Sequence, residues 1–180
     1  GAVRTELDFW HRIESGLRAS LPVTLALLLT LVCTLPLGPP GLGQIMPALP
    51  MICVFYWTVY RRDLMPLVAT FVIGIAHDSL SGAPLGGSAI VLLTLQGLAA
   101  RHRRFFHDKN IAVVWASFVA LVAVVQSLGW LIASFYHLQA LPLMPAIFQA
   151  LLTMALYPVI TLPFGVILRE LLQPLPVVPR

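Results

Sequence analysis

Residues 111–135, IAVVWASFVALVAVVQSLGWLIASF, form an apolar run that no charged side chain interrupts. An α-helix needs about 20 such residues to cross the ~30 Å hydrocarbon core of a bilayer. A second uncharged run covers residues 143–168. Both runs are long enough to cross with some tilt, so the sequence predicts an integral membrane protein.

The cationic side chains are sorted along the chain. All eleven Lys and Arg residues fall into four stretches that apolar sequence separates: residues 4–18, 61–62, 101–109 and 169–180. Three other connections contain neither residue: those near 38–44, 79–87 and 136–142. Short loops rich in Lys and Arg stay on the cytoplasmic side of a membrane. The alternation therefore predicts an even number of crossings, with both ends of the chain in the cytoplasm.

Composition supports the same class. Hydrophobic residues make up 59% of the 180 positions, charged residues only 10%, and the mean hydropathy is +0.91. A soluble domain carries charges on about a quarter of its residues, so too few charges are present to cover one. The net charge of +4 suits an anionic inner leaflet, and no separate nucleic-acid signature is present. We predict an all-α integral membrane protein, a compact bundle of six transmembrane helices in one domain.

Residues 21–168 would hold the spans, at about 21–37, 45–60, 64–80, 85–100, 111–135 and 143–168. The third and fourth are short, and a re-entrant hairpin in their place is the alternative topology. Their Gly- and Pro-rich connection is predicted to dip into the bundle, because irregular backbone at membrane depth must be buried in protein or line a wet cavity. Aromatic residues just before Arg61 predict an interfacial girdle: Phe55, Tyr56, Trp57 and Tyr60.

The two ends are predicted to be cytoplasmic. In residues 1–20, four apolar side chains recur three or four positions apart: Leu7, Trp10, Ile13 and Leu17. This stripe favours a short interfacial helix, with a disordered tail as the alternative. Residues 169–180 would form a cytoplasmic tail.

Small residues mark one face of the fifth predicted span. Ala112, Ala116 and Ala120 recur at four-residue spacing, a pattern that lets another helix backbone approach closely. The approaching helix could belong to this chain or to a partner, and packing within the chain is the favoured interpretation.

Asp78 is the one acidic residue outside the predicted cytoplasmic segments, in residues 74–86, GIAHDSLSGAPLG. A negative charge at the end of a helix opposes its dipole. In the favoured interpretation the carboxylate accepts backbone N–H groups of the following turn. In the alternative it faces a cavity and meets a ligand, a proton or a partner.

Signatures of catalysis and of metal binding are missing. Intramembrane aspartyl chemistry needs two carboxylates that share a site, and only Asp78 is available at depth. A serine–histidine pair drawn from Ser81, Ser88, His77 and His137 has no supporting motif, and the histidines and Asp78 lack close ligand spacing. We therefore predict no catalytic residues, no cofactor and no metal.

Two motifs resemble the MreD family of rod shape-determining proteins. They are Phe55-Tyr56-Trp57-x-x-Tyr60-Arg61-x-Asp63-Leu64-x-Pro66 and Gly74-x-x-x-Asp78-x-Leu80-x-Gly82-x-Pro84-Leu85-Gly86. A looser match is Trp115-x-x-Phe118. The resemblance marks nine residues as structural or functional: Tyr60, Arg61, Pro66, Gly74, Asp78, Gly82, Pro84, Leu85 and Gly86.

The resemblance implies a non-enzymatic scaffold of cell-wall elongation in the bacterial inner membrane. Its direct partner would be the transmembrane helix of MreC, beside membrane lipid. Through MreC it would influence RodA, a penicillin-binding transpeptidase and MreB. The alternative is a small-molecule-binding subunit similar to the substrate-binding components of energy-coupling-factor transporters, although residues 21–37 lack the Ala-x-x-x-Ala face usual in those proteins.

Overall fold

The computed structural model describes residues 16, 20–34, 46–106 and 109–172. Over these residues the chain is helical and contains no strand, as predicted. The helices cover Ser20–Thr34, α2 Leu49–Tyr60, α3 Leu67–Ser81, α4 Gly87–Phe106, α5 Ile111–Tyr136 and α6 Leu143–Leu172. A short 3-10 turn, η2 Arg62–Leu64, joins α2 to α3. The predicted interfacial helix and the tail beyond residue 172 lie outside the described residues.

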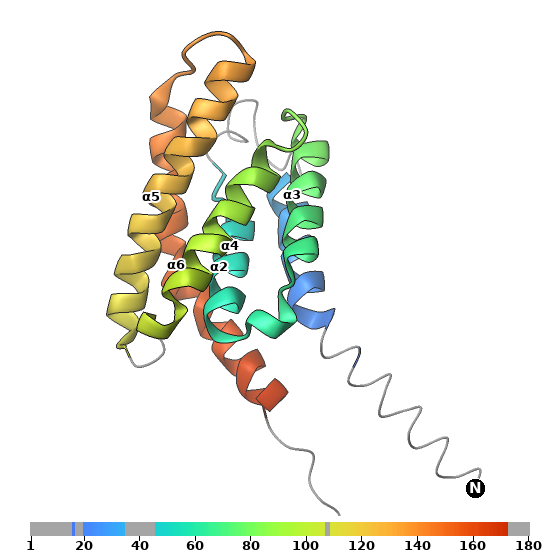
Figure 1. Cartoon of the computed structure of the whole chain (residues 1–180), viewed down its shortest axis with the longest axis vertical. Helices are drawn as coiled ribbons and strands as arrows, with labels where there is room; N and C mark the ends of the chain where they lie inside the picture. Colours follow the sequence, from blue (N-terminus) through green and yellow to red (C-terminus); the bar gives the residue numbers. More distant parts are fainter. Residues whose placement is uncertain (1–15, 17–19, 35–45, 107–108, 173–180) are drawn as a thin grey trace, which may run out of the picture.

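Helix α2 forms the centre of the bundle, and ten of its twelve residues are buried. It packs against α4 and α6, while α3 packs on α4, α4 on α5, and α5 on α6. Figure 1 shows α5 and α6 as a pair, with α4 crossing between this pair and α3. The buried face of the Ser20–Thr34 helix contributes Ala26 to the same core.

Helices α5 and α6 are long and apolar enough to cross a membrane: the qualifying segments are Ile111–Tyr136 and Leu143–Glu170. Three other apolar helices are shorter: Ser20–Thr34, α2 and α3. Helix α2 begins at Leu49, a few residues after the predicted start of the second span at about Ile45. Proline is favoured in the first helical turn, where its missing N–H is not needed, and Pro50 lies in that turn.

The predicted aromatic girdle is wrong for three of its four residues, while Tyr60 is half-buried next to Arg61. Phe55, Tyr56 and Trp57 are at most 5% exposed, because α2 is surrounded by other helices. Phe55 contacts the rings of Phe118 and Tyr157, whose own rings are stacked at a centroid distance of 4.3 Å. These aromatic side chains therefore join α2, α5 and α6 in the core instead of marking an interface.

Helix α6 continues through two internal prolines, Pro158 and Pro163. A proline lacks the N–H that would bond the carbonyl four residues before it, and for Pro158 that carbonyl belongs to Met154. The indole Nε1–H of Trp115, on α5, donates to the Met154 oxygen at 2.9 Å. A side chain of the neighbouring helix thus replaces the lost bond, as membrane helices with internal proline require.

The two ends of the bundle differ in charge. At one end lie the α2–α3 connection, the C-terminal part of α4, the start of α5 with residues 109–110 before it, and the C-terminal part of α6 (Figure 1). These segments hold every Lys and Arg that the structure describes: Arg61, Arg62, Arg101, Arg103, Arg104, Lys109 and Arg169. We call this the basic end. The α3–α4 turn and the α5–α6 turn lie at the opposite end and contain neither residue type.

Candidate functional site

The Asp78 carboxylate is buried beneath the α3–α4 turn, with the residue only 1% exposed. Its Oδ2 atom accepts the backbone N–H of Gly86 at 2.8 Å. The N–H of Ser88 lies 3.2 Å from both carboxylate oxygens. This is the geometry of the structural interpretation, in which the carboxylate holds the turn through backbone donors.

The charge of Asp78 suits the helix that follows it. The residue belongs to the last turn of α3, but Gly86 and Ser88 flank the first residue of α4, Gly87. The carboxylate therefore caps the N-terminus of α4, where unpaired N–H groups and the helix dipole favour a negative charge. The stabilised N-terminus belongs to the next helix, eight to ten residues further along the chain. The unfavourable position of Asp78 at the end of α3 therefore does not by itself predict its favourable position at the start of α4.

Two glycines of the turn adopt conformations that other residues avoid. Gly82 ends α3 with φ 68°, and Gly86 has φ 97°. Both values lie in the left-handed region, which a Cβ disfavours. The N–H groups of Gly82 and Ala83 donate to the Asp78 carbonyl, and Gly87 N–H donates to the Pro84 carbonyl. The side chain of Leu85 points outward from this turn, and the residue is 72% exposed.

Gly74 allows α3 and α4 to approach each other closely. A Cβ built on Gly74 would lie 2.4 Å from the Cα atom of Ala89 and 2.6 Å from its backbone nitrogen. Real Cβ atoms do not approach backbone so closely. The glycine therefore fixes the distance between the two helices that Asp78 links one turn further along α3.

His77 and Ser88 meet across the same turn, with 3.1 Å between His77 Nδ1 and Ser88 Oγ. A nucleophilic serine needs N–H donors aimed at a developing oxyanion. The nearby backbone donors of Gly86 and Ser88 already point to Asp78. We assign the pair a structural hydrogen bond between α3 and α4.

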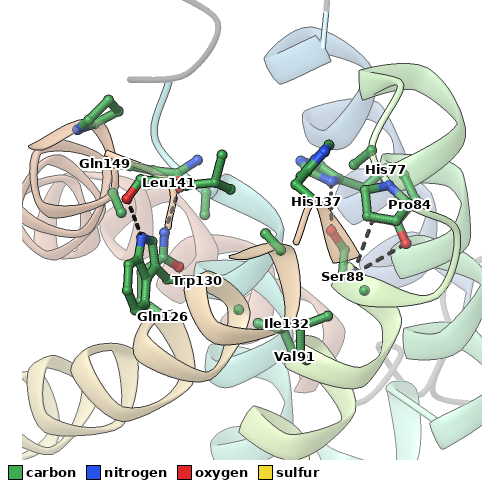
Figure 2. A pocket seen from close by; sticks show the side chains of 18 of the residues that line it. His77, Pro84, Ser88, Val91, Gln126, Trp130, Ile132, His137, Leu141 and Gln149 are labelled. Atoms are coloured by element: carbon green, nitrogen blue, oxygen red, sulfur yellow. Dashed lines mark hydrogen bonds between the residues drawn. The ribbon is translucent and has the colours of Figure 1, made fainter. Parts of the chain in front are cut away.

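A cavity of about 500 Å³ lies at this end of the bundle. We call it the outer cavity. Figure 2 shows His77, Pro84, Ser88 and His137 on one side, and Gln126, Trp130, Leu141 and Gln149 across from them. The structure thus brings polar residues of α3, α4, α5 and α6 into one space, although the sequence separates them by up to 72 positions, from 77 to 149.

The amide groups in this cavity bind irregular backbone. Gln126 donates to Gln149, which in turn donates to the carbonyl of Met46 at 3.0 Å. One turn along α6, the Thr153 hydroxyl accepts the N–H of Ala48 at 2.9 Å. These side chains satisfy the non-helical backbone before α2, which would otherwise carry unpaired polar groups inside the bundle.

The other motif, in residues 55–66, reaches the basic end, away from the cavity. Arg61 forms a forked ion pair with Asp63, with its terminal nitrogen 2.9 Å from Oδ2. The hydrogen bond from Arg61 lowers the pKa of the Asp63 carboxyl. Pro66 precedes the first residue of α3, and the rings of Tyr60 and Tyr56 lie 4.6 Å apart. The two motifs therefore mark two separate corners of the bundle.

The alanine face of α5 is not used for packing within the described residues. Ala112, Ala116 and Ala120 are all exposed. The favoured interpretation of the spacing, close packing against another helix of this chain, is wrong for this part of the structure. Helix α5 instead turns the buried residues Val114, Phe118, Val122 and Val125 toward the bundle.

Metal-ligand clusters are absent from the residues searched, since no three His, Cys, Asp or Glu side chains of the described chain gather in one place. Cys33 and Cys53 are free thiols.

These features define a helical membrane protein built around a buried aromatic core, with a carboxylate-capped turn at one end and arginines at the other. The chain belongs to the MreD family: the family described as rod shape-determining protein MreD matches residues 17–174. It is thus a membrane protein and a component of rod shape determination. Neither a search of curated proteins nor a search of solved structures gave a match.

Proposed function

We propose that this chain is a non-enzymatic scaffold of peptidoglycan elongation in the cytoplasmic membrane. Membership of the MreD family carries the proposal. The hydrogen bonds of Asp78 support it, because they assign this carboxylate to the backbone of a turn. The chain then acts by binding other membrane proteins.

The proposed topology has six crossings, with the basic end in the cytoplasm. All described cationic side chains lie at that end, and short basic loops remain cytoplasmic. Helix α2 has only 12 residues, equivalent to about 18 Å of helix. Its central position supports a shortened span, because irregular backbone is tolerated at membrane depth when protein surrounds it.

The proposed partner is the transmembrane helix of MreC, docked on the alanine face of α5. Ala112, Ala116 and Ala120 are exposed, and in lipid small residues allow backbones to pack closely. Through MreC the chain would influence RodA, its penicillin-binding transpeptidase partner and MreB.

Co-purification with MreC tests this surface. Ala116→Leu with Ala120→Leu places two bulky side chains on the proposed face, and we expect loss of MreC from the purified complex. Ala155→Leu is the matched control, because Ala155 is an exposed alanine on α6. Equal recovery of MreC with both variants would remove the α5 face from the interface.

A second candidate function is binding of a small molecule for transport, similar to the substrate-binding components of energy-coupling-factor transporters. The outer cavity favours it, since its volume of about 500 Å³ lies within the range of ligand pockets, about 300–1,000 Å³. Thermal stabilisation of the purified chain by a vitamin-sized, water-soluble compound would support this function, and a flat response across a vitamin panel would exclude it for that panel.

A further inference from the structure

A second cavity adjoins the outer cavity. It has a volume of about 490 Å³ and lies between α5 and α6. We call it the α5–α6 groove. Three residues line both spaces: Gln126, Trp130 and Ala146. The groove and the outer cavity are therefore neighbours that share a wall, and we call these three residues the junction.

The two spaces differ in chemistry. The outer cavity is lined by polar side chains from four helices, including His77, Ser88 and Gln149. The groove is lined almost entirely by apolar residues, among them Leu131, Ile147 and Leu151, which are 57%, 49% and 56% exposed. Because α5 and α6 are long enough to cross a membrane and these side chains point out of the bundle, the groove would face the acyl chains in a bilayer.

Two hydrogen bonds lie at the junction, one from α5 to α6 and one from α5 to the turn before α6. Gln126 donates to Gln149, and the indole of Trp130 donates to the Leu141 carbonyl at 3.1 Å. Ala146 contributes only a methyl group at this point. The junction thus consists of polar groups that already have partners and of one small side chain.

We propose that the outer cavity and the α5–α6 groove form one binding site for a membrane amphiphile. Its polar headgroup occupies the outer cavity and one acyl chain lies in the groove. A water-soluble ligand would leave the groove unfilled, and a purely apolar ligand would not match the histidine and glutamine side chains. Each volume is of ligand-pocket size, within about 300–1,000 Å³.

The lining also indicates the charge of the headgroup. Among the described residues, those that line the outer cavity include no Lys or Arg, so a headgroup with net negative charge would lack a counter-ion there. The carboxylate of Asp78 is already bonded to backbone N–H groups. His77 and His137 remain as hydrogen-bonding groups at the cavity wall. The site therefore favours a zwitterionic or uncharged headgroup over an anionic one.

The test uses the full chain in nanodiscs with equal amounts of phosphatidylethanolamine and phosphatidylglycerol. A phosphatidylethanolamine with a photoreactive group on one acyl chain serves as the probe. We expect its cross-links to concentrate in residues 123–131 and 146–154, which line the groove. Cross-links spread evenly over other exposed apolar faces, such as Phe71 and Val72 of α3, would overturn the proposal.

Variants at the junction give the second arm. Ala146→Phe places a bulky ring at a residue that lines both cavities. We expect phosphatidylethanolamine retained in native mass spectra to fall about tenfold, a factor that a modest loss of binding free energy produces. The matched control is Ala155→Phe on the same helix, which lines neither space. Equal retention by the two variants would overturn the proposal, as would preferential retention of phosphatidylglycerol by the wild-type chain. The wild-type cross-links decide the question if Ala146→Phe does not fold.

Discussion

The carboxylate of Asp78 accepts the backbone N–H of Gly86 at 2.8 Å, across a turn that joins two antiparallel helices. One buried side chain thereby connects the last turn of α3 to the first turn of α4. The same helices touch at Gly74 and Ala89, where no Cβ fits. The motif in residues 74–86 therefore fixes the packing of one helix pair, and residues of this motif form one wall of the outer cavity.

Asp78→Asn is expected to lower the stability of the chain in detergent. The amide oxygen is uncharged and can accept fewer bonds, while the amide NH₂ faces the N–H groups of Gly86 and Ser88. Loss of hydrogen bonds to a buried charged acceptor costs about 1.5–3 kcal/mol. Thermal unfolding measures the effect. Ser81→Ala serves as control, because that hydroxyl bonds only within its own helix, and a melting curve of Asp78→Asn that matches it would refute the structural role.

Gly74→Ala is expected to push α3 and α4 apart. The added methyl group would meet the backbone of Ala89, which cannot move without shifting α4, and overpacking of this kind costs about 1–3 kcal/mol. Gly97→Ala provides the opposite case, since nothing lies within 4 Å of a Cβ at that helical position. There the substitution should be neutral or gain about 0.5–1 kcal/mol. Similar melting temperatures for the two variants would contradict the proposed close approach.

A double-mutant cycle tests the bond between Trp115 and the Met154 carbonyl. Trp115→Phe removes the indole donor and is expected to cost about 0.5–1.5 kcal/mol. In a Pro158→Ala background the new N–H at position 158 can bond the same carbonyl, so the cost of Trp115→Phe should shrink. The unfolding free energies of the wild type, the two single variants and the double variant give the coupling energy. Strictly additive effects would show that Trp115 and Pro158 act independently.

The ion pair at the basic end predicts a pH dependence. Arg61 lowers the pKa of Asp63 below its ordinary value of 3.8, so the pair stabilises the folded chain above that pH and the contribution is lost as the pH falls through the lowered value. The Asp63 side chain is 62% exposed, which limits the effect to less than about 1 kcal/mol. Asp63→Asn should therefore melt slightly below the wild type at neutral pH and together with it in strong acid. A difference in melting temperature that persists at acid pH would show that the loss of stability does not come from the ion pair.

Thiol labelling of intact cells tests the topology. In a background without Cys33 and Cys53, a cysteine at Leu85 should react with a membrane-impermeant maleimide, because this side chain is exposed at the end opposite the arginines. A cysteine at the exposed Arg104 should react only after the cells are opened. Labelling of position 104 in intact cells would reverse the proposed orientation.

The predictions from sequence agree with the structure where each one depended on a single continuous segment of the chain. Helices α5 and α6 match the two longest apolar runs to within a few residues, because an uninterrupted apolar segment satisfies its own backbone bonds as a helix. Helix α2 begins at Leu49 instead of near the predicted start of the second span, about Ile45, because Pro50 favours the first turn of a helix. The alanine spacing of α5 was identical to that of a packed face, yet Ala116 and Ala120 are exposed, since spacing does not specify whether a second helix is present.

The sequence by itself determined the class of protein, the order of the helices and the gathering of cationic side chains at one end. These properties depend on composition and on short segments, for which the bilayer sets the length and the charge preference. Only the tertiary structure decided that Asp78 caps α4, that Trp115 serves the carbonyl freed by Pro158, and that an outer cavity adjoins a groove between α5 and α6. Those relationships depend on which helices lie side by side, and the hydrogen bonds that carry them form between residues that the chain order alone does not pair.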